Sequence, residues 1–125
     1  MEQPTREELL AWDRWHVWHG FTQMAEYEPL ILVEAQRCRV RDLEGRWYLD
    51  GVASLWCNVH GHRHPALDAA IRAQLERVAH VTNLGASNVP AIQLAHRLAR
   101  LAPPGLEHVF FSDDGSTAVE VALKM

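Results

Sequence analysis

The sequence predicts an α/β fold that begins with a small antiparallel meander, continues with two helices and ends with a strand–turn–helix unit. Three observations predict it. Short apolar or alternating segments flank a turn signal between residues 30 and 50. Apolar residues then recur at helical spacing over two stretches. A short, fully apolar segment at residues 109–111 finally runs into Gly-Ser-Thr and a third helical stretch.

The meander is expected over residues 30–50. An apolar run (residues 30–33), an alternating segment (38–41) and a third short segment (47–49) follow one another. Before the third segment, Asp42 and Gly45 stand first and fourth in a turn sequence, which suits a type I turn that leads into a left-handed residue.

Tryptophan recurs every third residue near the start, at Trp12, Trp15 and Trp18. This spacing can place the rings on one helical face, and Gly20 is expected to break any helix there. We expect these rings to pack against a neighbouring surface rather than to bind a ligand.

The two helices of the middle section have clear start signals. Pro65 stands at the start of the first, where its missing N–H costs nothing, and Pro90 lies in the first turn of the second, which opens near Asn88. Residues 103–105, Pro-Pro-Gly, end the second helix. The expected buried stripes are Leu67, Ile71, Leu75 and Val78 in the first helix and Ala91, Leu94, Ala95, Leu98 and Leu101 in the second.

Composition and charge exclude several function classes. Of the 125 residues, 48% are hydrophobic, and the formal net charge is −4. An acidic chain argues against a nucleic-acid binder, and no apolar run approaches the ~20 residues of a membrane span. The polar first residues lack a secretory signal, and two cysteines are too few for a disulfide framework. We expect a cytoplasmic protein.

The turn after the last apolar segment is a candidate anion site. Gly115 lets the backbone approach a ligand closely, and the free N–H groups at the start of the following helix favour a phosphate. The hydroxyls of Ser116 and Thr117 can add hydrogen bonds. The same residues also fit an ordinary helix N-cap at Ser116 or Thr117, because serine and threonine are common N-cap residues.

The sequence offers two other candidate sites, a histidine cluster and a cysteine. His60, His62 and His64 could present imidazoles to zinc, but Gly61 and the proline that follows indicate a turn, so no metal site is expected. Cys57 could act as a nucleophile with a nearby histidine, but nothing supplies a third, orienting group.

Three motifs together point to a family. They are WHGFTQM at residues 18–24, LDGVASLWCNVHGHRHP at 49–65 and FFSDDGSTAVEVALKM at 110–125. In this order they resemble the motifs of class III aminotransferases, pyridoxal phosphate enzymes of fold type I, and especially of the branch that forms 7,8-diaminononanoate for biotin. The resemblance extends from about Trp15 to the end of the sequence. It implies that the chain is the N-terminal portion of such an α/β enzyme.

The resemblance implies a set of site residues. Gly115, Ser116 and Thr117 would hold the phosphate of pyridoxal 5'-phosphate, and Phe21, Leu55 and Trp56 would bind the substrates. Many members of the family carry Tyr in place of Phe21 and Trp in place of Leu55. Both departures fall where the amino donor binds, so the donor is expected to be S-adenosylmethionine, the usual one, or lysine. The acceptor would be 8-amino-7-oxononanoate.

The resemblance also implies what the sequence lacks. The Schiff-base lysine of the family lies far downstream of the Gly-Ser pair, and the only lysine here, Lys124, follows that pair by about two helical turns. We therefore expect a fragment that is inactive alone, with an N-terminal segment and small-domain meander (1–60) and the truncated start of the large domain (61–125). The full-length protein is expected to be a homodimer with small-molecule substrates.

Two alternatives stay open at this point. The first is another class III aminotransferase, of the ω-amino acid:pyruvate type. The second is a small, non-catalytic binding module.

Overall fold

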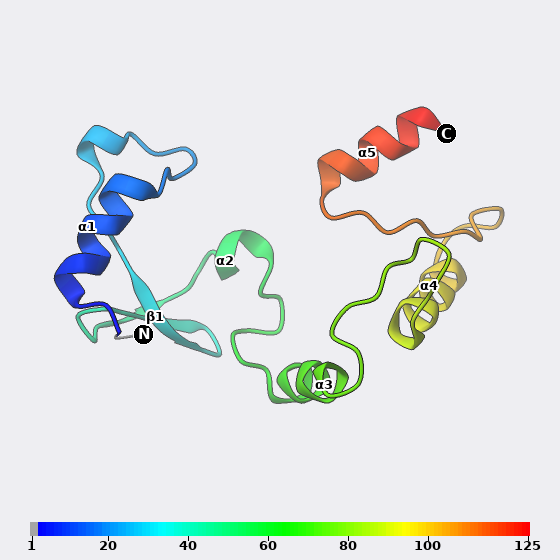
Figure 1. Ribbon diagram of the computed structural model, residues 1–125, viewed down its shortest axis with the longest axis horizontal. Helices are drawn as coiled ribbons and strands as arrows, with labels where there is room; N and C mark the ends of the chain where they lie inside the picture. The colour runs from blue at the N-terminus through cyan, green and yellow to red at the C-terminus, as the bar shows by residue number, and fades with distance from the viewer. Residues whose placement is uncertain (1–2) are drawn as a thin grey trace. The chain divides into compact units, whose positions relative to one another are not determined.

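The computed structural model describes residues 3–125 and contains nine short elements (Figure 1). In chain order they are α1 (Arg6–His16), η1 (Met24–Glu26), β1 (Leu32–Gln36), β2 (Arg39–Asp42), β3 (Trp47–Leu49), α2 (Ala53–Trp56), α3 (Pro65–Leu75), α4 (Val89–Leu101) and α5 (Gly115–Lys124). Met1 and Glu2, with which the polar first residues begin, lie outside the described residues. The chain forms two compact units, Met1–Leu75 and Glu76–Met125. The expected domain division after residue 60 concerns a longer protein and stays a prediction.

Helix α1 begins with a reciprocal cap. The hydroxyl of Thr5 accepts a hydrogen bond from the N–H of Glu8 at 3.2 Å, and the Glu8 carboxylate accepts one from the N–H of Thr5 at 2.8 Å. Val17, at the other end, has extended backbone angles and stops the helix. Trp18 therefore lies beyond α1, and the three tryptophans do not share one helical face.

The meander is confirmed. Its three antiparallel strands follow the order β1-β2-β3, with Val40 of β2 paired to Ala35 on one side and to Tyr48 on the other. The turn between β2 and β3 also forms as predicted. The N–H of Gly45 donates to the carbonyl of Asp42 at 3.0 Å, and Gly45 has a φ of +83°, which glycine adopts without strain.

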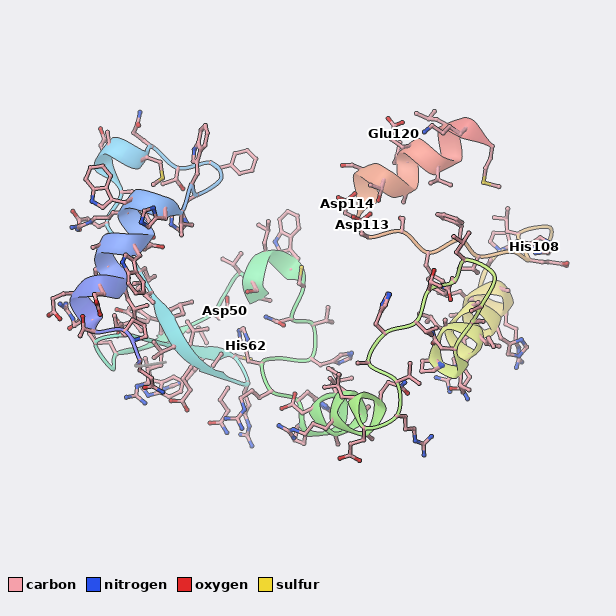
Figure 2. The ribbon with its side chains drawn as sticks, in the orientation of Figure 1. Asp50, His62, His108, Asp113, Asp114 and Glu120 are labelled. Atoms are coloured by element: carbon pink, nitrogen blue, oxygen red, sulfur yellow. The ribbon has the colours of Figure 1, made fainter. Side chains whose placement is uncertain are left out.

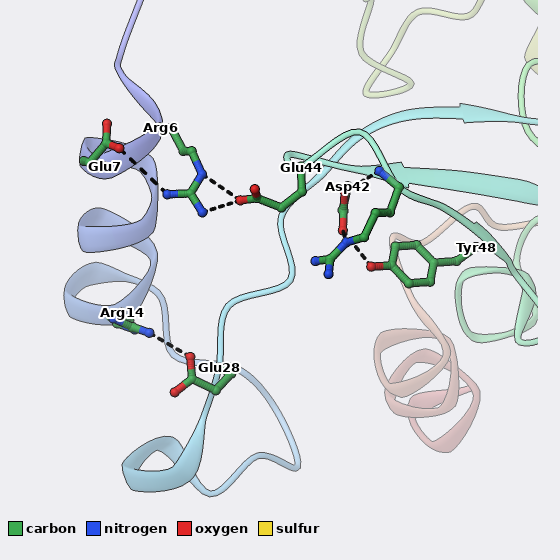
Figure 3. Close-up of polar contacts among 8 residues, drawn as sticks. Arg6, Glu7, Arg14, Glu28, Asp42, Glu44 and Tyr48 are labelled. Carbon is green, nitrogen blue, oxygen red and sulfur yellow. Dashed lines mark hydrogen bonds and ion pairs between the residues drawn. The ribbon is translucent and has the colours of Figure 1, made fainter.

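Ion pairs attach the segments before the meander to each other and to it (Figure 3). Arg6 of α1 donates through Nε to Oε1 of Glu44, in the β2–β3 turn, at 2.6 Å. Arg14, two turns further along α1, donates to Glu28 at 2.8 Å. Three of these side chains are about half exposed and Glu28 is 85% exposed, so each pair adds little stability by itself.

The remaining helices start as the sequence predicts. Pro65 is the first residue of α3, and the side chain of Asn88 accepts from the N–H of Ala91 at 2.9 Å to cap α4. Helix α3 ends at Leu75, so Val78 lies beyond its stripe. Helix α4 ends at Leu101, just before the Pro-Pro-Gly segment.

The expected strand at residues 109–111 is not formed among the described residues. A strand needs a neighbour to satisfy its backbone groups, and no other segment of the described chain pairs with this one. It instead connects α4 to α5 without regular structure.

No hydrophobic side chain is buried in residues 3–125, so the expected apolar stripes of α3 and α4 stay uncovered. Leu67 and Ile71 of α3, for example, are 48% and 61% exposed. Most of these residues lie within the helices as predicted, but the prediction that they are buried is wrong for the described chain, which provides nothing to cover them. In the same part of the chain, no helix is both long and apolar enough to cross a membrane.

Candidate functional site

The start of α5 is a tightly hydrogen-bonded cap. The carboxylate of Asp114 accepts from the N–H of Thr117 at 2.8 Å, and the hydroxyl of Thr117 accepts from the N–H of Asp114 at 3.2 Å. The same hydroxyl lies 2.7 Å from the carboxylate of Asp113, to which it donates. The N-cap is therefore Asp114, and the local alternative of an N-cap at Ser116 or Thr117 is wrong. Figure 2 shows both aspartates at the start of the helix.

Both aspartates are stabilised in their ionised form. The hydrogen bond from the Thr117 hydroxyl lowers the pKa of Asp113, and the backbone N–H of Thr117 lowers the pKa of Asp114. Their negative charges face the positive end of the α5 dipole, which favours anions. A phosphate bound here would share that end of the helix with the Asp114 carboxylate.

Gly115 and Ser116 leave room for such a group. Apart from its two chain neighbours and the backbone of its own helix, a Cβ atom built on Gly115 would meet no atom within 4 Å, so no other described residue occupies the space beside it. Within residues 3–125 the hydroxyl of Ser116 has no hydrogen-bond partner, whereas the hydroxyl and N–H of Thr117 are engaged in the cap. The donors that fit an approaching phosphate are thus those of Gly115 and Ser116, and Thr117 holds the cap in shape.

The three candidate substrate residues all belong to the first unit and are exposed. Phe21 is fully exposed, at the point where the chain turns with a φ of +52°. Leu55 and Trp56, which are 66% and 80% exposed, both lie in α2. No described residue covers Phe21, Leu55 or Trp56. Their side chains are therefore available for contact with a ligand or with another part of a protein.

Element α2 is a single turn with left-handed backbone. Ala53, Ser54, Leu55 and Trp56 have φ values of +50°, +52°, +57° and +71°. For residues other than glycine this conformation costs about 1–2 kcal/mol each, because Cβ crowds the following carbonyl. Such strain persists only where the surrounding structure imposes it, and it is common at functional sites.

A hollow beside α2 has a volume of about 540 Å³, and its lining residues are Leu32, Val33, Glu34, Ala35, Val40, Asp50, Val52, Ser54, Leu55 and His62. Its wall is mostly aliphatic, with one acid–imidazole pair. Figure 2 shows Asp50 and His62 directed toward each other, and His62 Nε2 lies 2.7 Å from Asp50 Oδ2.

Both ring nitrogens of His62 are engaged. The hydrogen bond from His62 lowers the pKa of Asp50, so the carboxylate is ionised and Nε2 carries the proton. Nδ1 then accepts from the amide of Asn58, 3.3 Å away. In residues 3–125 no three His, Cys, Asp or Glu side chains gather as metal ligands do.

Sequence reasoning missed Asp50, because twelve positions separate it from His62 and no local spacing links them. It treated His62 only as one of three histidines in a turn. Cys57, the other candidate, is exposed, and its thiol lies 3.5 Å from the carbonyl oxygen of Leu55. No described histidine is hydrogen-bonded to it.

Comparison with known proteins identifies the family. The family model described as aminotransferase class-III matches residues 22–125. The chain belongs to the class III aminotransferases. This confirms the family resemblance and the expected α/β fold.

Individual relatives agree with this family. The chain is 57% identical, over 120 residues, to an adenosylmethionine-8-amino-7-oxononanoate aminotransferase of Nitratidesulfovibrio vulgaris, covering 94% of this chain and 22% of that protein. The crystal structure of the enzyme of that name from Methanocaldococcus jannaschii superposes with a TM-score of 0.89 at 40% identity, over 96% of this chain and 28% of the other.

A more distant class III structure is nearly as similar in fold. A taurine:2-oxoglutarate aminotransferase from Bifidobacterium kashiwanohense, solved in complex with PLP and glutamate, gives a TM-score of 0.88 at 26% identity, covering 99% of this chain and 28% of that one. The chain thus spans about a quarter of the length of these relatives. Aminotransferases with different substrates share this backbone.

Proposed function

We propose that this chain is the N-terminal part of a pyridoxal phosphate-dependent aminotransferase that converts 8-amino-7-oxononanoate into 7,8-diaminononanoate, a step of biotin biosynthesis. The observation that carries the proposal is the 57% identity, over 94% of the chain, to a relative that bears this name. The fold alone does not favour one substrate, since the taurine enzyme has nearly the same TM-score. The proposal is therefore supported by the curated relatives of this name, which are 57%, 53% and 52% identical to the chain.

The cofactor would be held, in part, at the start of α5. The N–H of Gly115 and the hydroxyl of Ser116 are the donors suited to its phosphate, and the open space beside Gly115 admits it. Thr117 contributes by fixing Asp113 and Asp114 so that they do not turn toward the phosphate. When bound, pyridoxal phosphate supplies an electron sink that allows an amino group to pass between two substrates.

The proton-transfer base lies outside the present sequence in this proposal. Lys124 ends α5, about two turns beyond the phosphate donors, and Asp113 and Asp114 are hydrogen-bonded within the cap. The chain alone is therefore proposed to be inactive, and the full protein is proposed to be a cytoplasmic homodimer whose partners are small molecules.

Phe21, Leu55 and Trp56 are proposed to contact the substrates. Phe21 lacks the hydroxyl, and Leu55 the indole, that many relatives in the family carry. Loss of a hydrogen bond and of a stacking surface weakens the site for a large cationic sulfonium donor more than for the acceptor. We therefore propose lysine as the better donor, with S-adenosylmethionine used poorly.

The test is a donor comparison with the complete protein. Purified enzyme is supplied with pyridoxal phosphate, 8-amino-7-oxononanoate and either lysine or S-adenosylmethionine, and 7,8-diaminononanoate is measured by mass spectrometry. Formation of product with either donor supports the reaction, and faster formation with lysine supports the donor assignment. Efficient turnover with S-adenosylmethionine and none with lysine contradicts the donor assignment alone. Transfer to pyruvate from an ω-amino acid, with no diaminononanoate formed, contradicts the proposed substrate.

A further inference from the structure

The left-handed turn α2 needs an external restraint, because four consecutive non-glycine residues do not hold positive φ values by themselves. The restraint must act on both ends of the turn. Asp50 lies just before α2 in the chain, and His62 lies six residues after it.

Asp50 holds the first end. The backbone N–H groups of Ser54 and Val52 help to lower the pKa of its carboxyl group, after the larger effect of His62, so the carboxylate favours this end of the turn electrostatically. It also accepts from His62 Nε2 at 2.7 Å, which ties this end to the returning chain. The two side chains are only 13% and 15% exposed, and water therefore competes weakly for their hydrogen bond.

His62 is itself fixed to the meander. Its N–H and carbonyl exchange two hydrogen bonds with the backbone of Arg37, of 2.8 and 2.9 Å. The side-chain amide of Asn58 is hydrogen-bonded to His62 Nδ1. The backbone N–H of Asn58 donates to the carbonyl of Ala53 at 2.9 Å. His62 thus connects the hairpin between β1 and β2, through its backbone, to Asp50 and Asn58 on the two sides of the left-handed turn, through its ring.

The pair and the turn also line one hollow. Asp50, Ser54, Leu55 and His62 all border the aliphatic hollow beside β1. Leu55 is presented from the strained turn, and the acid–imidazole pair fixes the base of that turn. A change at the pair is therefore transmitted to Leu55 and Trp56 through one short backbone segment.

We propose that Asp50 and His62 are positioning residues, whose hydrogen bond holds the left-handed turn so that Leu55 and Trp56 meet the substrate in a fixed place. This inference rests on the proposed function for the role of Leu55 and Trp56. The pair touches neither cofactor nor reacting atoms, and its effect falls on substrate affinity.

The experiment uses the complete, cofactor-loaded protein with His62→Leu, which removes both ring hydrogen bonds, and His62→Gln, which keeps an N–H donor for Asp50. We expect His62→Leu to raise the KM for the amino donor on the order of tenfold, with kcat and cofactor content within about twofold of wild type. His62→Gln should retain most of the affinity. An unchanged KM, or a fall in kcat and cofactor content with KM constant, overturns the proposal.

A matched rescue separates positioning from general stability. Ser54→Gly removes the strain at one residue inside the turn, and Arg63→Gly removes the same strain at a residue outside it, where φ is +54°. In the His62→Leu background, Ser54→Gly should lower the KM most of the way back to the wild-type value, and Arg63→Gly should leave it raised. Equal recovery by both overturns the proposal. If His62→Leu does not fold, Asp50→Asn takes its place.

A readout independent of activity distinguishes the two proposals. Chymotrypsin cleavage after Trp56, followed by mass spectrometry without substrate, should be faster in His62→Leu than in wild type and slower again with Ser54→Gly. If the wild-type protein forms no diaminononanoate but this cleavage pattern holds, the proposed function fails and the restraint of the turn stands. Equal cleavage in all variants overturns the restraint, whatever the activity.

Discussion

The phenol of Tyr48 donates a 2.6 Å hydrogen bond to Oδ2 of Asp42, across the turn that joins β2 to β3. The Nε and backbone N–H of Arg46 donate to the same carboxylate, both at 2.8 Å. Asp42, 2% exposed, is the only buried residue of the described chain. The most buried residue of residues 3–125 is thus a carboxylate that accepts three hydrogen bonds. In most folded domains the most buried residues are apolar.

Asp42 makes the meander sensitive to acid. Burial by itself would raise the pKa of Asp42, but the hydrogen bonds from Tyr48 and Arg46 outweigh burial and lower the pKa to about 2. A carboxyl whose folded pKa lies below its unfolded value of about 3.9 stabilises the fold above that value. This stabilisation is lost as the pH falls from about 4 through about 2.

We expect Asp42→Asn to lower the urea midpoint of the complete protein at neutral pH. The difference in urea midpoint between Asp42→Asn and wild type should stay constant down to about pH 4.5 and become smaller below it. Other carboxyls titrate alike in both proteins, so the difference isolates Asp42. Tyr48→Phe, which removes one donor, should give a smaller gap of the same pH dependence. A gap that widens in acid would contradict this account.

Gly61 is required by its neighbours as well as by its backbone angles. It has a φ of +77°, and a Cβ atom there would lie 2.9 Å from the carbonyl oxygen of Arg37. Gly61→Ala should therefore lose more than the about 1–2 kcal/mol that left-handed strain alone costs. Gly85→Ala is the matched control, since Gly85 has a φ of +73° with open space around it. Urea unfolding of both variants should rank Gly61→Ala as the less stable, and the reverse order would count against the close contact with Arg37.

The cap of α4 rests on one side chain. Asn88 accepts from the N–H of Ala91 at 2.9 Å, and Asn88→Ala should cost about 1 kcal/mol of unfolding free energy. Asn88→Ser should cost much less, because serine also accepts at an N-cap. Thermal unfolding of the complete protein checks both variants. Equal losses would show that the amide acts through another contact.

Ser116 is expected to affect the cofactor alone. Ser116→Ala removes a hydroxyl that has no partner in residues 3–125, so it should leave stability unchanged and weaken pyridoxal phosphate binding on the order of tenfold. Ser112→Ala, four residues earlier, removes a hydroxyl that donates to the carbonyl of Asp114 at 3.3 Å and serves as the control. Fluorescence or absorbance titration with the cofactor measures the affinities. Equal effects of the two changes would exclude a specific phosphate contact at Ser116.

The 125-residue chain by itself is not expected to unfold cooperatively. Its described hydrophobic side chains are all at least partly exposed, which leaves too little burial to offset conformational entropy. The isolated chain should bind a hydrophobic dye such as ANS and show a broad, gradual thermal transition. A sharp transition with no dye binding would contradict this expectation and show that the chain folds by itself.

Features that depend on neighbouring residues were predictable from the sequence. The turn of Asp42 and Gly45, the proline at the start of α3 and the Asn88 region at the start of α4 all follow from side chains within four positions of the feature. The meander also follows, because its strands are joined by short turns. Most of the secondary structure was therefore accessible without tertiary information.

Features that depend on distant partners were not predictable. The strand expected at residues 109–111 needs a paired strand that the described chain lacks. The left-handed turn at α2 contradicts the preference of each of its residues and is imposed by Asp50 and His62, twelve positions apart. For the candidate site, the resemblance supplied Gly115 and Ser116, whereas the assignment of the N-cap to Asp114 needed the geometry of the hydrogen bonds.

The contrast between the meander and the uncovered helices has a kinetic consequence. The meander and the contacts of α1 with it close loops of fewer than about forty residues, and hairpins of this kind form in about 1–10 μs. Helices α3, α4 and α5 bury no hydrophobic side chain in residues 3–125, and each is too short to be stable alone in water. Folding of this segment is therefore expected in two stages, an early one that the meander nucleates and a later one that waits for the surfaces that cover the helices.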